Sequence, residues 1–229
     1  MLSTHFFADP HFLELLAFWD ESRGGRPLPD WSGDMAVFPR GVLPYLIVSD
    51  RRSGQAIYRY VGAECVRRWG SDPTGQVAYG TVLHGAHARY LQSLGRDVMA
   101  HRAPVFSTAV YQPDAASMLM TGRLHTPFTY QGTREPCVLV TLQLFTGSER
   151  DLQTIGIAGV VDEVRRYLIA DVPTVCARLA EARRSYQIAR HTHGRTLVRD
   201  IDALLGQLAG GALVQLPCWD DPGDPPDPA

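Results

Sequence analysis

The sequence contains no lysine and no asparagine, so all 22 of its basic residues are arginine. The codons of both missing residues are rich in A, and their joint absence indicates a GC-rich, bacterial genome. This codon bias accounts for the arginines without invoking phosphate recognition, for which arginine is otherwise well suited.

Closely spaced cysteines and long apolar runs are absent as well. The four cysteines are too far apart for a CxxC motif or for the paired spacing of a zinc site; they are Cys65, Cys137, Cys176 and Cys218. This spread favours free thiols in a reducing compartment. No apolar run approaches the roughly 20 residues of a membrane helix, and residues 1–10 lack the pattern of a secretory signal. We therefore expect a cytoplasmic protein that does not enter a membrane.

The common catalytic motifs are missing too. The sequence has no GxSxG, HExxH, Walker or GxGxxG pattern, which excludes the commonest hydrolase, metalloprotease and nucleotide-binding classes. The net charge is −2, and residues 220–229 hold four aspartates and no cation, so the rest of the chain carries a net charge of +2. A nearly neutral body does not favour nucleic acid as a partner.

Hydrophobic periodicity predicts a helix at the start of the chain. Residues 10–22 place four apolar side chains at helical spacing: Phe12, Leu15, Leu16 and Trp19. Asp9 and Pro10 suit a helix cap and first position, and Gly24-Gly25 suits its end. Residues 26–41 hold three prolines and predict a loop. Residues 1–41 are therefore interpreted as an N-terminal flanking helix and a loop.

The central part of the chain predicts an α+β domain over residues 42–146. A strand hairpin, a short helix, a longer helix and three further strands are expected, at 42–49, 56–61, 63–69, 82–100, 104–111, 117–130 and 135–145. Early strands, a helical middle and a final three-stranded meander favour one five-stranded antiparallel sheet.

The last third of the chain predicts helices. Residues 160–170, 175–189 and 196–208 are helical by pattern, so residues 147–218 are interpreted as a helical extension. Residues 219–229 are rich in proline and aspartate and predict a disordered acidic tail.

Several short motifs in the first 76 residues occur in an order that resembles the bacterial single-domain PAS family. They are Phe18-Trp19, Arg23-Gly24-Gly25-Arg26, Asp50, Tyr58-Arg59, Gly62, Gly70, Asp72 and Thr74-Gly75. The likeness extends more weakly to about residue 146, where strand pattern alone supports it, and it does not cover residues 147–229.

This resemblance implies a PAS-like five-stranded antiparallel sheet with helices on one face, which can enclose a small pocket. It implies a sensory or protein-interaction module of signal transduction that relays a conformational change and performs no catalysis. By fold analogy the ligand-binding residues would be Tyr58, Tyr60, Trp69, His84, His87, Tyr90 and Leu124. Phe12, Leu15, Leu16 and Trp19 would cover the open face of the sheet or the sheet of a partner in a homodimer.

The sequence does not establish whether the protein binds a cofactor, and the two considered are haem and flavin. Haem-binding PAS sensors carry an axial histidine on the helix that here begins with His84 and His87, although both residues can also face solvent at a helix start. Flavin-binding PAS photosensors carry a cysteine near the position of Cys65, but the polar flavin contacts are missing around it. A small packed thiol is the favoured interpretation.

Two alternatives from other classes remain. A basic run in the last third could contact nucleic acid or an acidic partner; it comprises Arg183, Arg184, Arg190, Arg195 and Arg199. Glu181, Asp200 and Asp202 balance this charge, which favours a solvated helix face. His191 and His193 do not lie in a phospho-acceptor sequence, and no ATP-binding domain follows them. The remaining alternative is a small-molecule enzyme with an unrecognised pocket.

Overall fold

The computed structural model describes residues 9–79, 85–112, 119–145, 160–189, 205–208 and 211–219. His84, the basic residues from 190 to 199, His191, His193 and the acidic tail from residue 220 lie outside this part of the chain.

The first helix forms as its sequence predicts. Helix α1 spans Pro10–Arg23, and the carboxylate of Asp9 accepts a hydrogen bond from the backbone N–H of His11 at 2.9 Å. The helix ends at Gly24, whose φ of 54° is left-handed and therefore suits a residue without a Cβ atom.

The core of the fold is one sheet of eight strands. They are β1 Asp30–Trp31, β2 Leu46–Asp50, β3 Ile57–Val61, β4 Val105–Gln112, β5 Leu119–Tyr130, β6 Val138–Phe145, β7 Val160–Ile169 and β8 Leu213–Gln215. The strand order is β3-β2-β6-β5-β4-β7-β8, with antiparallel pairing throughout, and β1 pairs in parallel with the end of β5. The predicted α+β class with an antiparallel sheet is confirmed. The five expected strands, β2 to β6, are contiguous, but the sheet is larger than five strands.

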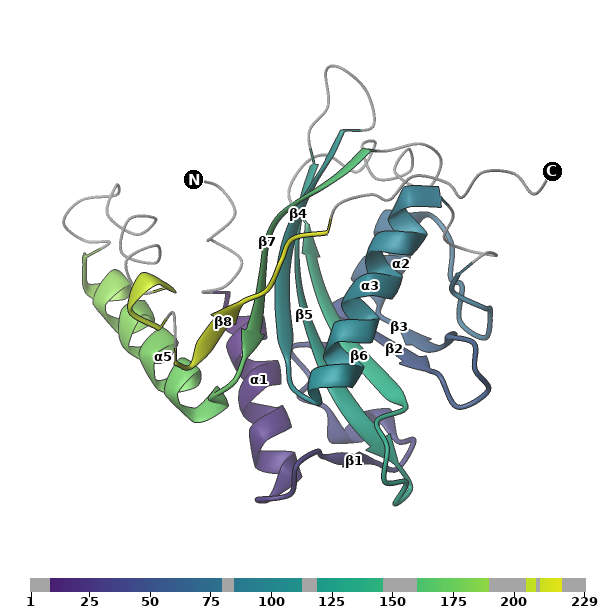
Figure 1. Cartoon of the computed structure of the whole chain (residues 1–229), viewed down its shortest axis with the longest axis horizontal. Helices are drawn as coiled ribbons and strands as arrows, with labels where there is room; N and C mark the ends of the chain where they lie inside the picture. Colours follow the sequence, from purple (N-terminus) through teal and green to yellow (C-terminus); the bar gives the residue numbers. More distant parts are fainter. Residues whose placement is uncertain are drawn as a thin grey trace.

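Helices cover both faces of this sheet. Besides α1 they are α2 Ala63–Trp69, α3 Gly85–His101 and α5 Val172–Ala189, with short 3-10 turns at Met35–Val37 and Leu43–Tyr45. Figure 1 shows α1 and α5 side by side on one face and α3 across the other. The expectation of helices on one face therefore holds for α2 and α3, while α1 and α5 close the opposite face.

The helical extension predicted for residues 147–218 is wrong at two places, because Val160–Ile169 and Leu213–Gln215 are strands. Val160, Val161 and Val164 recur at a spacing that fits a helix, but β-branched residues also favour strands. Antiparallel pairing with β4 decides the outcome, because it extends the sheet beyond the fifth expected strand. Helix α5 confirms the expected helix at 175–189.

The face beneath α1 is a hydrocarbon core. Phe12, Leu15, Leu16 and Trp19 are all buried against apolar strand residues that include Leu124 and Phe128 of β5. The indole N–H of Trp19 donates a hydrogen bond of 2.8 Å to the carbonyl of Pro127, which fixes α1 on β5. These side chains thus cover the sheet of their own chain. Their assignment to a dimer surface stays a prediction.

Candidate functional site

The sheet face beneath α3 is buried and partly polar, in contrast to the face beneath α1: an apolar cluster that includes Leu94, Val105 and Leu139 lies beside buried polar side chains. Eight side chains from β4, β5, β6 and β7 form what we call the polar layer: Ser107, Thr121, Arg123, His125, Thr141, Gln143, Glu163 and Arg166. They alternate along the strands with the apolar residues of the α1 face, as the two-residue period of a strand requires. Buried polar groups usually have hydrogen-bond partners, so any atom of this layer without one is a candidate contact for a ligand.

His125 lies at the centre of the sheet and is 3% exposed. Its Nδ1 lies 2.8 Å from the Thr141 hydroxyl, whereas its Nε2 is buried and has no hydrogen-bond partner among the residues that the structure describes. Burial, reinforced by the charge of Arg123, holds the pKa of His125 well below its usual range. The imidazole is therefore neutral, with one ring nitrogen available to a water or a ligand.

Arg123, 1% exposed, brings a positive charge beside this histidine. Its guanidinium donates to the Thr121 hydroxyl at 2.5 Å and lies 5.7 Å from the centre of the Tyr90 ring of α3. Burial and the same charge lower the pKa of His87, also on α3, to about 3. Two neutral imidazoles and one guanidinium thus share the space between α3 and the sheet.

An ion network ties the polar layer to α3. Arg166 of β7 contacts both Glu163 and Asp97 through its guanidinium, at 2.8 and 2.5 Å, and donates to the Ser93 hydroxyl at 2.9 Å. Burial raises the pKa of Glu163, while the hydrogen bond from Arg166 opposes this shift. Glu163 also accepts the backbone N–H of Trp219, so the segment after β8 closes over the pair.

A β-bulge makes this ion pair possible. Residues three apart in a regular strand point to opposite faces, yet Glu163 and Arg166 both face α3. The register between β4 and β7 shifts between Thr108 and Ala109, which inserts one extra residue into β7. The bulge brings both charges to one side of the sheet.

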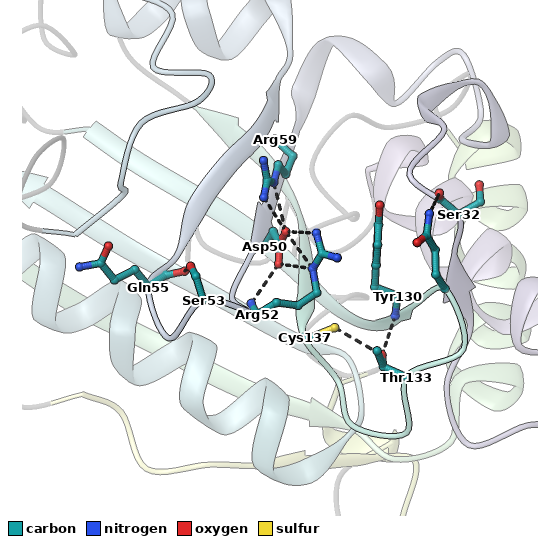
Figure 2. Close-up of polar contacts among 10 residues, drawn as sticks. Ser32, Asp50, Arg52, Ser53, Gln55, Arg59, Tyr130, Thr133 and Cys137 are labelled. Carbon is teal, nitrogen blue, oxygen red and sulfur yellow. Dashed lines mark hydrogen bonds and ion pairs between the residues drawn. The ribbon is translucent and has the colours of Figure 1, made fainter.

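A second polar cluster lies at the end of β2. Figure 2 shows Arg52 and Arg59 converging on the buried carboxylate of Asp50, at 2.6 and 2.9 Å. The hydrogen bond from Arg52 holds the pKa of Asp50 well below its usual range, with a further contribution from Arg59. The Arg52 guanidinium lies 3.8 Å from the centre of the Tyr130 ring. This cluster is saturated with partners and fixes the β2–β3 hairpin.

A groove of about 790 Å³ opens beside the polar layer, between the β2–β3 turn, α3 and the β5–β6 turn. Its polar walls include Arg51, Gln55, Tyr79, Gln92, Arg96 and Glu135. Surface pockets that hold small molecules have volumes of this size. The groove and the polar layer both border α3, because Arg51 lies against Gly95 of this helix and Asp97, two residues further on, pairs with Arg166.

Four of the seven predicted ligand-binding residues lie on the α3 side of the sheet, two on α3 itself and two in a separate cluster around α2. Tyr90 and His87 lie on α3, and the rings of Tyr58 and Trp69 pack against each other at 6.1 Å beneath α2. Burial raises the pKa of Tyr58 above its usual range, while the charge of Arg123 acts in the opposite direction.

The other predicted ligand-binding residues do not join this group. Leu124 and Tyr60 lie on the α1 face, and the Tyr60 hydroxyl donates to the carbonyl of Leu43 at 3.1 Å. Tyr58 and Tyr60 are two residues apart and would share one face of a regular strand, but a register shift in β2–β3 makes Arg59 a bulge residue and separates them. His84 lies outside the described residues.

The roles of Arg123 and His125 were not predicted from the sequence. Their signal was the alternation of Thr121, Arg123 and His125 with apolar neighbours, which usually indicates a solvent-facing strand face. Helix α3 covers that face, and a single strand does not reveal which of its two faces a distant helix covers.

The cysteine considered for flavin chemistry is buried. Cys65 of α2 is fully covered, and burial raises the pKa of its thiol to about 12. A protonated thiol is a poor nucleophile, which supports the packed-thiol interpretation. Haem ligation through His87 stays a prediction.

Within the described ranges, no group of three or more His, Cys, Asp or Glu residues is arranged to hold a metal ion. The helices in the same part of the chain are too short or too polar to cross a membrane. No protein-family model matches the chain, and no curated protein matches its sequence.

Proposed function

We propose that this protein is a PAS-type sensory module, in which a small molecule binds at the α3 face of the sheet and no reaction follows. The observation that carries this proposal is the buried polar layer with its unsatisfied His125 Nε2. A buried polar atom without a partner costs about 1–3 kcal/mol, and a bound ligand or water removes that cost.

The arrangement of the elements supports the same proposal. Strands β2 to β6 form a continuous antiparallel unit, and the helices α2 and α3 lie between β3 and β4 in the chain. Hairpin, helices and three-stranded meander follow one another as the PAS resemblance implies. The three further strands and α5 then belong to an extension of the module.

The relay would run through the sheet to α1 and α5. These two helices pack against each other on the face opposite α3, and β7 contacts α3 before the chain enters α5. A ligand that shifts α3 against β7 would therefore change the packing of α5 on α1. The homodimer expected from the sequence stays a prediction, and the four α1 residues assigned to it are buried against the sheet of their own chain.

Native mass spectrometry tests this function. The purified protein is incubated with the low-molecular-weight fraction of a bacterial extract, and we expect a small molecule to remain bound and to be released on denaturation. His125→Leu removes the unsatisfied nitrogen and should abolish retention, whereas Thr126→Val, the neighbouring residue on the opposite face, should preserve it.

Hydrogen exchange measured on the same samples reports the relay. Slower exchange in α3 together with changed exchange in α1 and α5 is the expected result. A molecule that is retained equally by His125→Leu, or chemically converted during incubation, would contradict the proposal.

A further inference from the structure

Among the residues that the structure describes, the groove beside α3 is lined by two arginines and by no carboxylate that is free to neutralise them. Arg51 and Arg96 line it, and neither forms an ion pair with any residue that the structure describes. Glu135 lies at the rim and is engaged by Arg102 at 2.8 Å. The groove is therefore a site of positive charge.

Local structure holds the Arg51 guanidinium in place. It donates to the neutral hydroxyl of Tyr79 at 3.2 Å and lies 5.6 Å from the centre of that ring. It also lies against Gly95 of α3, where a Cβ atom would come within 2.9 Å of its terminal nitrogens. A glycine in the middle of a helix lowers the stability of the helix. Gly95 is explained by the space that the Arg51 guanidinium occupies, which a larger residue would fill.

Arg52, the next residue along the chain, has different surroundings from Arg51. Arg52 turns to the other side of the hairpin, where it is neutralised by Asp50, while Figure 2 shows Gln55 pointing away from that cluster. Consecutive arginines thus have different surroundings: one is paired with a buried carboxylate, and the other lines an open groove.

The other residues that line the groove have amide or apolar side chains. Gln55 and Gln92 offer hydrogen-bond donors and acceptors, and the apolar walls include Val77, Met99 and Pro136. A ligand that fits these walls has an anionic group at one end and an apolar body at the other. Planar carboxylates match the paired donors of a guanidinium.

We propose that the groove binds a small organic carboxylate, with Arg51 as the principal contact to the carboxylate group and Arg96 as the second cation. This inference rests on the proposed function in one respect: it takes the bound carboxylate to be the signal that the module senses. The site itself stands on the groove and its charges.

Binding of paired probes tests the ligand class. Isothermal titration compares benzoate, phenylacetate, hexanoate and succinate with the corresponding uncharged amides, at low salt. We expect at least one carboxylate to bind at least about tenfold more tightly than its amide, because charge-assisted hydrogen bonds are roughly twice as strong as neutral ones.

Four variants test the position of the site. Arg51→Gln should weaken carboxylate binding about tenfold or more, and Arg96→Gln should weaken it less because Arg96 is exposed. Arg40→Gln removes an equal charge from an exposed position outside the groove and should leave binding unchanged. Gly95→Ala should also weaken binding by displacing the guanidinium, without lowering the stability of the helix.

The outcomes separate this inference from the proposed function. Absence of binding by every carboxylate, equal binding of the amides, or equal losses in Arg51→Gln and Arg40→Gln would overturn the inference. Binding of inorganic phosphate in place of the carboxylates would overturn the assigned class. Carboxylate binding that leaves hydrogen exchange in α1 and α5 unchanged would keep the inference and remove the sensory relay.

Discussion

Helices α1 and α3 cover opposite faces of one sheet, but α1 lies on hydrocarbon, whereas α3 lies on apolar residues together with buried charged and hydroxyl groups. Hydrocarbon contacts are non-directional and tolerate small shifts of a helix, whereas buried hydrogen bonds and ion pairs do not. The α1 face is suited to stability. The α3 face is suited to a response, because a ligand there can alter which polar groups have partners.

Breaking the ion network of the α3 face should give the largest effect on stability. Arg166→Met leaves Glu163 buried without its guanidinium partner, which should lower the free energy of unfolding by about 4 kcal/mol. Urea unfolding followed by circular dichroism measures it. The double variant with Glu163→Leu removes both charges and should recover most of the loss; a double variant as unstable as the single one would contradict this explanation.

A large-to-small substitution on the α1 face should have the next largest effect. Leu15 of α1 is completely buried against the sheet. Leu15→Ala should lower the free energy of unfolding by about 3 kcal/mol, because it removes apolar contacts and leaves a cavity. The same urea experiment measures it. Because the proposed relay couples the α3 face to α1 and such coupling is reciprocal, Leu15→Ala should also change carboxylate affinity, and an unchanged affinity would show that the two faces are independent.

Acid should destabilise the protein through the polar layer. The unfolded pKa of a histidine is about 6.5 and the folded pKa of His125 is far lower, so below pH 6.5 only the unfolded chain gains a proton there. Between pH 7 and pH 5 this should remove about 2 kcal/mol of stability, with no change above pH 7.

His87, with its pKa lowered to about 3, should act in the same direction. His125→Gln should therefore flatten the pH dependence of unfolding without abolishing it. A slope equal to that of the unsubstituted protein would show that His125 titrates normally.

The smallest effect concerns the one buried hydrogen bond described between α1 and the sheet. Trp19→Phe keeps an aromatic ring but removes the donor to the Pro127 carbonyl, and should lower the free energy of unfolding by about 1 kcal/mol. Hydrogen exchange of α1 should accelerate. An effect as large as that of Leu15→Ala would mean that the hydrogen bond, not the hydrocarbon, holds α1.

Much of the fold followed from local sequence. Asp9, Pro10 and Gly24 mark the ends of α1, and the strand-helix-strand order of residues 42–146 follows from hydrophobic period. Residues 160–169 were misassigned, because their apolar spacing fits a helix and their pairing with β4 is not visible in a window of ten residues.

The candidate site was less predictable, and the two bulges explain much of the difference. One bulge separates Tyr58 from Tyr60, and the other brings Glu163 and Arg166 together. A single extra residue reverses the facing of every later position, and nothing in the sequence around Arg59 marks it.

The closure of the polar layer by Trp219 has a consequence for how the chain folds as it is made. The amide of Trp219 reaches back 56 residues to Glu163, so this contact cannot form until residue 219 has left the ribosomal exit tunnel. By then α1 and the β2–β6 unit have already emerged. The Glu163 carboxylate can pair with Arg166 before then, but its hydrogen bond from Trp219 forms only after the rest of the polar layer has been synthesised.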